Sequence, residues 1–427
     1  MRSRALRVCV VTGSRADYGL LKPLLRELQA DPETELQLLV TGMHLAPEFG
    51  LSVRVIEADG FQPDARVEML LSSDTPTGTA RSLGLGVMGA ADALARLEPD
   101  WVVVLGDRFE MFAAAQAALV LRLPTAHIAG GDVTLGAFDE ALRHAMTKTA
   151  HLHFVTNERA RRRVVQLGEV PTRVHNVGSP GLDLIRQLEP VSRDTLAERL
   201  GVAFRETNLL VTFHPVTLEP DSAAQYAELL AALADLPESF GFVFTGSNAD
   251  PAGRELLAMT RAFCERLPGR AAYFTSLGED YVRLMAHVDA VVGNSSSGLY
   301  EAPSFKIPTL NIGTRQGGRV RADSVTDVPA ERAAISRGLR RALEGDYTDT
   351  VNPYGDGHAA PRIVRHLKAV EDPVSLLKKP FFDLPGVAFE NYLSADETGR
   401  NGFDRAAEET DAMSIETANA EEVAYDA

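Results

Sequence analysis

Residues 6–19, LRVCVVTGSRADYG, decide the fold of this chain. The apolar run at 6–11 predicts a strand buried on both faces, and a helical stretch follows from Gly19. Between them, small residues such as Gly13 let the backbone approach a ligand, and a helix start offers unpaired N–H groups to an anion. Arg15 adds a positive charge there. The segment therefore predicts a strand–turn–helix unit that is either an anion-binding turn or a plain connection, and it matches neither the GxGxxG nor the GxxxxGK[ST] pattern.

Apolar strands and helices alternate along the rest of the chain. Strands are predicted at 7–11, 36–40, 101–105, 124–128, 153–156, 208–212, 241–245, 271–274, 290–292 and 309–312. Helices are predicted at 19–29, 86–97, 109–121, 158–167, 223–233, 251–266 and 279–286. This alternation is typical of α/β proteins with doubly wound parallel sheets. The two series of strands predict two Rossmann-like domains that face each other across a cleft, with ligands at the carboxyl ends of the strands.

Turn-forming residues mark the predicted domain boundary. The sequence GSPG at 178–181 favours a connection there, so we expect one domain at 1–178 and a second, nucleotide-binding domain at 179–380. Residues 383–427 contain twelve Asp and Glu against two Arg, with few large apolar residues. This composition predicts a disordered acidic tail, either a solvated segment without a partner or a regulatory one.

The composition restricts the class of protein. A length of 427 residues suits two domains, and a formal net charge of −16 argues against nucleic acid as a partner, because phosphates are bound by Lys and Arg. No apolar run approaches the roughly 18 residues that a membrane span needs, and the run at 6–11 is too short for a signal peptide. The two cysteines, Cys9 and Cys264, predict neither a disulfide framework nor a metal site. We therefore expect a cytoplasmic protein that binds no membrane.

Charged side chains gather after two strands of the first domain. Asp107 and Arg108 follow the strand at 101–105, where they are expected to lie at the cleft or to form a structural ion pair. The next strand ends in HIAGGD at 127–132, and then come Asp139, Arg143 and His144. On a helix, Asp139 and Arg143 are four residues apart and could pair on one face.

Polar residues of that second group are candidates for chemistry. Asp132 and His127 lie at the end of an apolar strand, which a helical ion pair does not explain. Metal binding is not expected, because no HxxxH or HExxH spacing is present.

The second domain carries its own polar residues at strand ends. His214 follows the strand at 208–212 and is either a satisfied structural histidine or part of the cleft. The segment 293–301, GNSSSGLYE, predicts a loop and a helix start, in which Ser295 and Ser296 could hold a phosphate or only cap the helix. Glu301 could accept hydrogen bonds from ribose hydroxyls, and Arg315 adds a cation after the next strand.

Together, in this order, these motifs resemble the hydrolysing UDP-N-acetylglucosamine 2-epimerases of sialic-acid-type sugar biosynthesis, a family that includes the diacetamidobacillosamine nucleotide 2-epimerases. The resemblance covers about residues 6–370 and rests on the motifs GSRADYG at 13–19, GDR at 106–108, HIxGG at 127–131, RHAMTK at 143–148, HPVT at 214–217, GNSS at 293–296 and GTRQ at 313–316. It implies a glycosyltransferase-B-type fold, a homodimer or homotetramer, and catalysis without a metal or redox cofactor.

The implied reaction is an elimination followed by a hydration. The nucleoside diphosphate leaves C1 while a base removes the C2 proton; water then adds to the glycal and releases a free sugar inverted at C2. Asp107, Asp132 and Asp139 are the candidate acids and bases, and His214 is expected to touch the diphosphate or sugar. Residues expected to bind the sugar nucleotide are Arg15, Arg108, Arg143, His144, Asn248, Ser295, Ser296, Glu301 and Arg315.

Two positions depart from the family pattern. Members specific for UDP-N-acetylglucosamine often carry a glutamate at the position of Ala129, and some relatives carry a lysine at the position of Leu20, where this chain has Lys22 two residues later. The predicted substrate is therefore UDP-N-acetylglucosamine or a UDP- or GDP-linked N,N'-diacetylbacillosamine. The alternatives are a glycosyltransferase of the same fold and an inactive nucleotide-binding sensor.

Overall fold

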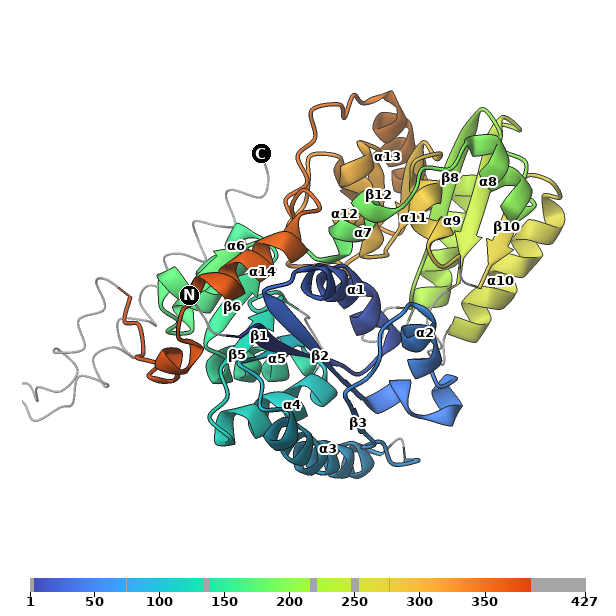
Figure 1. Ribbon diagram of the computed structural model, residues 1–427. Coiled ribbons are helices and arrows are strands. Elements are labelled where there is room, and N and C mark those ends of the chain that lie inside the picture. The colour runs from blue at the N-terminus through green and yellow to red at the C-terminus, as the bar shows by residue number, and fades with distance from the viewer. Residues whose placement is uncertain are drawn as a thin grey trace, which may run out of the picture. The chain divides into compact units, whose positions relative to one another are not determined.

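The computed structural model describes residues 4–73, 75–133, 138–215, 221–246, 253–275 and 277–384. Within these ranges the chain forms two parallel sheets with helices between most consecutive strands (Figure 1). The α/β class with two Rossmann-like sheets, predicted from the sequence, is confirmed.

The first sheet has the strand order β3-β2-β1-β4-β5-β6-β7, and its paired strands are parallel. Its strands are β1 (Leu6–Thr12), β2 (Thr34–Thr41), β3 (Ala65–Val67), β4 (Trp101–Leu105), β5 (Thr125–Ile128), β6 (Leu152–Val155) and β7 (Val174–Asn176). The order reverses between β1 and β4. In open α/β sheets such a reversal opens a crevice at the carboxyl ends of the strands, where ligands bind.

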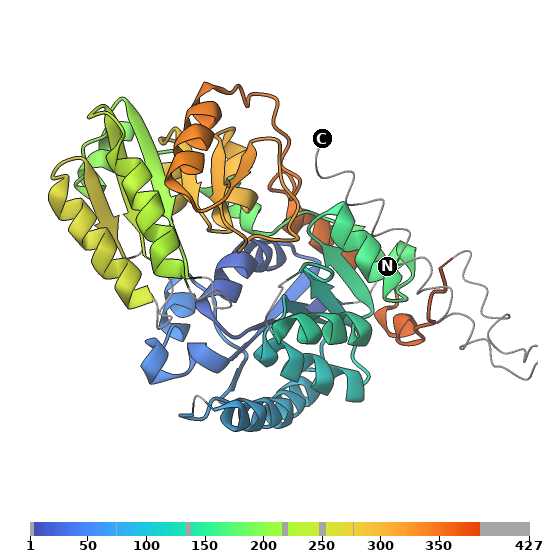
Figure 2. The same cartoon turned by 180° about the vertical axis from the view of Figure 1, so that it is seen from behind.

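Both faces of the first sheet are covered, as continuous apolar strands require. In β1, Val8 and Val10 belong to a core shared with α1 (Arg15–Ala30) and α14 (Ala359–Ala369). Cys9 and Val11 belong to the opposite core, shared with α3 (Pro76–Leu97) and α4 (Phe109–Val120). Figure 2 shows α3 and α4 side by side from behind. Cys9 is buried, as expected.

The remaining elements of the first half are short. The helices are α2 (Val53–Ala58), α5 (Asp139–Thr149) and α6 (Glu158–Gln166), and the 3-10 turns are η1 (Gly42–His44), η2 (Pro47–Phe49) and η3 (Pro171–Arg173).

The second sheet has the order β10-β9-β8-β11-β12-β13, again with parallel pairs. Its strands are β8 (Thr207–Thr212), β9 (Phe240–Thr245), β10 (Ala271–Phe274), β11 (Ala290–Gly293), β12 (Thr309–Ile312) and β13 (Val325–Val328). Helices here are α8 (Arg193–Leu200), α9 (Ser222–Ala234), α10 (Gly253–Arg266), α11 (Asp280–Met285), α12 (Ser297–Tyr300), α13 (Arg332–Glu344) and the 3-10 turn η4 (Ala302–Phe305). The order reverses between β8 and β11, and at such a reversal open α/β sheets bind their ligands.

The chain returns to the first sheet after β13. Helix α14 packs in the same core as α1, although it lies near the end of the chain (Figure 1). The carboxylate of Asp183, in α7 (Gly181–Gln187), accepts the backbone N–H groups of Ala359 and Ala360 at 2.9 and 2.7 Å and so holds the start of α14. A 3-10 turn, η5 (Pro373–Leu377), follows. The predicted boundary near 178 stays a prediction.

Both ends of each predicted strand lie within two residues of the ends of a strand in the structure. Three short strands, β3, β7 and β13, were not predicted. Helix α3 begins ten residues before the predicted helix, which started at Gly86. At Gly86, a Cβ atom would lie 2.6 Å from the Met69 side chain, so glycine there permits close packing rather than ending the helix. Among the described helices, none combines the length and apolarity of a membrane span.

Candidate active site

The first strand–helix turn holds a buried carboxyl group. Ser14 caps α1 by accepting the Asp17 N–H at 3.3 Å, and Asp17 accepts the Gly13 N–H at 3.3 Å. Burial raises the pKa of Asp17 to about 6, although the nearby Arg108 opposes the rise. Arg15 lies exposed in the first turn of the helix. The turn thus brings a positive side chain and a proton-holding carboxyl to the end of β1.

Asp107 and Arg108 leave β4 in different directions. The turn passes through Gly106, whose φ of 78° favours glycine. Asp107 forms an ion pair with Arg143 of α5, and Arg108 pairs with the buried Glu110 at 2.7 Å. Both residues therefore form ion pairs, each with a partner other than its neighbour.

Helix α5 brings further charges against the Asp107 turn. Arg143, only 8 % exposed, donates to the Ala129 carbonyl at 2.9 Å as well as to Asp107. The predicted pair between Asp139 and Arg143 is wrong, because Arg143 turns toward the sheet. Burial, and then the charge of Asp107, raise the pKa of Asp139. Asp139 therefore holds a proton more readily than a free aspartate and lies near a second carboxyl group, Asp107, which is paired with an arginine.

His144 stands one residue after Arg143 on α5. The i,i+4 ion pair on this helix joins it to Glu140, at 3.2 Å.

Asp132 and His127 have structural partners. Asp132 accepts from the Thr156 hydroxyl at 2.8 Å and from Asn157 at 3.4 Å, and burial raises its pKa. The Nε2 atom of His127 lies 2.8 Å from the Gly106 carbonyl oxygen, and its Nδ1 lies 3.2 Å from the Thr147 hydroxyl. Burial lowers the pKa of His127 to about 3, so the ring is neutral and its single N–H can serve the carbonyl. His127 thus supports the turn that carries Asp107.

After the end of β8, the backbone of His214 is hydrogen-bonded to the side-chain amide of Asn294. The Asn294 side chain accepts the His214 N–H at 2.7 Å and donates to the His214 carbonyl at 2.8 Å. Burial, and then the charge of Arg315, lower the pKa of His214 to about 4. Arg315 donates to the Asn294 carbonyl at 3.1 Å. The Nδ1 atom of His214 is buried and has no hydrogen-bond partner among the described residues.

The serine-rich loop differs from the prediction. The expected helix is a single turn, α12, whose N-terminal neighbour Ser296 makes no side-chain capping bond. Instead, the Ser297 hydroxyl donates to the Ser295 hydroxyl at 3.0 Å and lies 2.5 Å from the hydroxyl of Tyr281. A turn this short has a small dipole, so hydroxyl groups are the main donors here.

Glu301 follows α12 and is buried without a complete set of partners. Its Oε2 atom has no hydrogen bond within the described ranges, and burial raises the pKa of the carboxyl to about 7. An unsatisfied buried acceptor calls for an explanation, and ribose hydroxyls would satisfy it.

Sequence reasoning missed Arg319. Its guanidinium lies 5.6 Å from the centroid of the Tyr300 ring and donates to Gln316 at 2.8 Å. Burial raises the pKa of Asp132, and the positive charge of Arg319 partly opposes this rise. Arg319, which follows a strand of the second sheet, therefore lies near Asp132, which follows a strand of the first. Its position four residues after Arg315, in the same loop, is the signal that could have identified it.

Some predicted positions lie outside the described residues. These are Asn248, Val216, Thr217 and the tail from 385 onward. Within the described part of the chain, no group of three or more His, Cys, Asp or Glu side chains is placed to hold a metal ion.

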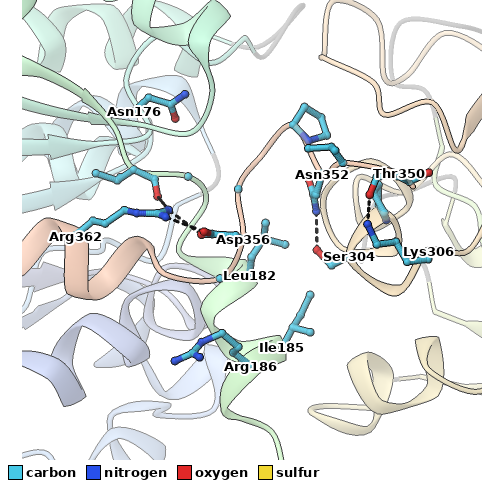
Figure 3. A pocket seen from close by; sticks show the side chains of 17 residues that line it. Asn176, Leu182, Ile185, Arg186, Ser304, Lys306, Thr350, Asn352, Asp356 and Arg362 are labelled. Atoms are coloured by element: carbon cyan, nitrogen blue, oxygen red, sulfur yellow. Dashed lines mark hydrogen bonds and ion pairs between the residues drawn. The ribbon is translucent and has the colours of Figure 1, made fainter. Parts of the chain in front are cut away.

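A separate cavity of about 790 Å³ lies where the chain crosses between the sheets. Figure 3 shows Leu182 and Ile185 of α7 on one side and Asn352 and Lys306 on the other. None of the predicted site residues lines this cavity.

The two sheets, each with polar side chains at its switch point, define a protein of the glycosyltransferase-B-type fold. Comparison with known proteins agrees with this class. The structure of UDP-GlcNAc 2-epimerase from Neisseria meningitidis bound to UDP-GlcNAc superposes with a TM-score of 0.70 at 21 % identity, covering 85 % of this chain and all of that one.

The UDP-N-acetylglucosamine 2-epimerase family matches residues 26–368, and the chain belongs to this family. The GDP/UDP-N,N'-diacetylbacillosamine 2-epimerase (hydrolyzing) of Campylobacter jejuni is 37 % identical over 75 % of this chain and 84 % of its own length. Polysialic acid biosynthesis protein P7 of Escherichia coli is 37 % identical over 89 % of this chain and 98 % of its own.

Proposed function

We propose that this protein is a hydrolysing 2-epimerase of a nucleotide-linked 2-acetamido sugar. The observation that carries the proposal is the pair of carboxyl groups Asp107 and Asp139, set in unlike environments beside Arg143. Removing a proton from C2 and returning one to the other face of that carbon needs two such groups. The family membership and the hydrolysing relative support the same reaction.

In the first step, Asp107 takes the C2 proton while the C1–O bond breaks. The electron pair of the C–H bond forms the C1–C2 double bond, and the pair of the C1–O bond leaves with the diphosphate. Arg143 holds Asp107 in place, and Arg108, tied to Glu110, adds positive charge at the same edge.

In the second step, Asp139 delivers a proton to C2 while a water oxygen bonds to C1; the proton that this water loses passes to Asp139, and Asp107 releases its proton to solvent. Its raised pKa suits a group that holds a proton until this point. The products are the nucleoside diphosphate and a free sugar inverted at C2. Asp132 is tied to Thr156 and Asn157, so we assign it to holding the loop rather than to proton transfer.

The second sheet is proposed to hold the nucleotide. Arg315 and the ring of His214 would meet the diphosphate, and the Ser295 hydroxyl would offer a further donor. Glu301 would accept from the ribose. This side of the site needs no catalytic metal, and the absence of a metal or redox cofactor stays a prediction.

Two substrates are proposed, UDP-N-acetylglucosamine and a UDP- or GDP-linked N,N'-diacetylbacillosamine. The second is favoured by the activity for which the Campylobacter relative is named and by Ala129, which replaces a carboxylate with a methyl group beside Arg143. A smaller, uncharged side chain there suits a sugar with an additional substituent.

A turnover screen over UDP- and GDP-linked forms of both sugars, with proton NMR in D₂O, tests the proposal. We expect free sugar inverted at C2, one deuterium at C2, and release of nucleoside diphosphate without an acceptor. Turnover only after addition of an acceptor would instead identify a glycosyltransferase, and binding without any turnover would identify a sensor.

We also propose that the protein assembles as a homodimer or homotetramer and acts in the cytoplasm. Apolar side chains stand exposed on neighbouring helices, Met88 of α3 at 68 % and Val120 of α4 at 80 %. Light scattering after gel filtration measures the assembly, and Val120→Glu should shift it toward the monomer. The two free cysteines agree with a reducing compartment.

A further inference from the structure

The segment at 373–380, here called the C-terminal strap, follows α14 and returns to the first sheet. Arg173 donates to the Leu376 carbonyl at 3.2 Å and so fixes the middle of the strap. Three residues later, Lys379 turns inward and is only 14 % exposed. The strap thus places one buried cation against elements that lie more than 200 residues earlier in the chain.

Lys379 meets the C-terminal end of α5. Its Nζ atom donates to the carbonyl oxygens of Thr147, Lys148 and Ala150 at 3.2, 2.8 and 2.5 Å. The last carbonyls of a helix have no partner within the helix, and a cation there both bonds them and opposes the helix dipole. Lys379 therefore closes the end of the helix whose other end carries Asp139.

The buried carboxylate of Glu169 ties the strap to the same helix. Its oxygens lie 2.8 Å from Lys379, 2.6 Å from Lys148 and 2.8 Å from Nε2 of His153. Glu169 is 1 % exposed. One carboxylate thus joins the strap, the last turn of α5 and strand β6.

Lys379 carries its charge in a largely buried position. Burial lowers the pKa of Lys379 to about 8 despite the opposing effect of Glu169, so its charge costs folding free energy on balance. The titratable and charged groups that face it are Glu169, Lys148, Arg173, His151 and His153.

A continuous set of contacts leads from Lys379 to the candidate catalytic carboxyls. Thr147, whose carbonyl Lys379 binds, places its hydroxyl 3.2 Å from His127. His127 in turn holds the Gly106 carbonyl, directly before Asp107. The same helix presents Arg143 to Asp107 one turn earlier.

We propose that Lys379 is a positioning residue: by closing the end of α5 it sets the geometry of Asp107 and Asp139. This inference rests on the proposed function for its catalytic readout. The inference goes beyond the proposed function because it assigns a role in catalysis to a segment outside both sheets.

The test compares Lys379→Met, Lys379→Arg and the matched control Lys378→Met, whose side chain is exposed on the same strap. A misplacement of about 1 Å can cost up to about 100-fold in rate, so we expect Lys379→Met to lower kcat roughly tenfold. KM and the Kd for UDP should stay within about twofold, because the second sheet holds the nucleotide. Lys379→Arg should recover most of kcat, and Lys378→Met should match the unmodified protein.

Hydrogen exchange of the peptide 139–150 adds a readout that needs no substrate. Faster exchange in Lys379→Met, and not in Lys378→Met, supports the positioning role even if no sugar nucleotide is turned over, in which case only the proposed function fails. Unchanged kcat with unchanged exchange overturns the inference. Parallel losses of kcat, UDP binding and thermal midpoint overturn it as well, since they indicate general loss of structure.

Discussion

Glu301 provides a test in which stability and binding should change in opposite directions. Its pKa rises from 4.5 to about 7 because the folded protein buries the carboxyl with an unpartnered oxygen. The folded state therefore holds the proton more tightly than the unfolded chain. Stability is highest below pH 4.5 and falls as the pH rises toward 7, where the folded state must accept the charge.

The cost follows from the shift. At about 1.4 kcal/mol per pKa unit, the charge destabilises the fold by about 3 kcal/mol at pH 8 and by about 1 kcal/mol at pH 5. Glutamine keeps the shape and carries no charge, so Glu301→Gln should recover this free energy. For a folded region of this size we expect a rise in thermal midpoint of about 3 °C at pH 8 and about 1 °C at pH 5.

The assay is calorimetry of the unmodified protein and of Glu301→Gln at pH 5 and pH 8, with titration of UDP at pH 8. The control is Glu344→Gln, an exposed glutamate at the end of α13. We expect UDP to bind Glu301→Gln about tenfold more weakly, because a ribose hydroxyl loses a charged acceptor. A variant that is no more stable than the unmodified protein at pH 8, or equally stabilised at both pH values, refutes this reasoning.

Other substitutions separate the roles of the two sheets. Asp107→Asn and Asp139→Asn should each lower kcat by roughly 10²–10⁴-fold with UDP binding retained, as steady-state rates and titration calorimetry will show. Of the two variants, only Asp107→Asn should lower the thermal midpoint, because it removes the partner of the buried Arg143. Asp139→Asn should not lower it, because burial raises the pKa of Asp139 and so penalises its charge in the folded state. Near-normal rates in both would contradict the carboxylate assignment. Arg315→Ala should weaken UDP binding about tenfold, against an exposed control, Arg340→Ala; equal binding by both would remove Arg315 from the nucleotide site.

The local sequence determined the elements and the ends at which polar residues gather. Runs such as WVVVL at 101–105 are apolar at every position, and only a strand covered on both faces buries all of them. Side chains directly after such strands, Asp107 and His214 among them, must lie at the carboxyl edge of a sheet. These conclusions need only the period of a strand and the direction of the chain.

The tertiary structure alone decided which charges meet. The spacing of Asp139 and Arg143 on one helix favoured a pair between them, but Arg143 meets Asp107 because β4 lies next to β5 and α5 packs beside α4. The contacts of Lys379 with Glu169 and the end of α5 span over 200 residues. Coulomb energy and desolvation depend on distance and burial in space, which sequence separation does not reveal, and the raised pKa values of Asp139 and Glu301 follow from the same cause.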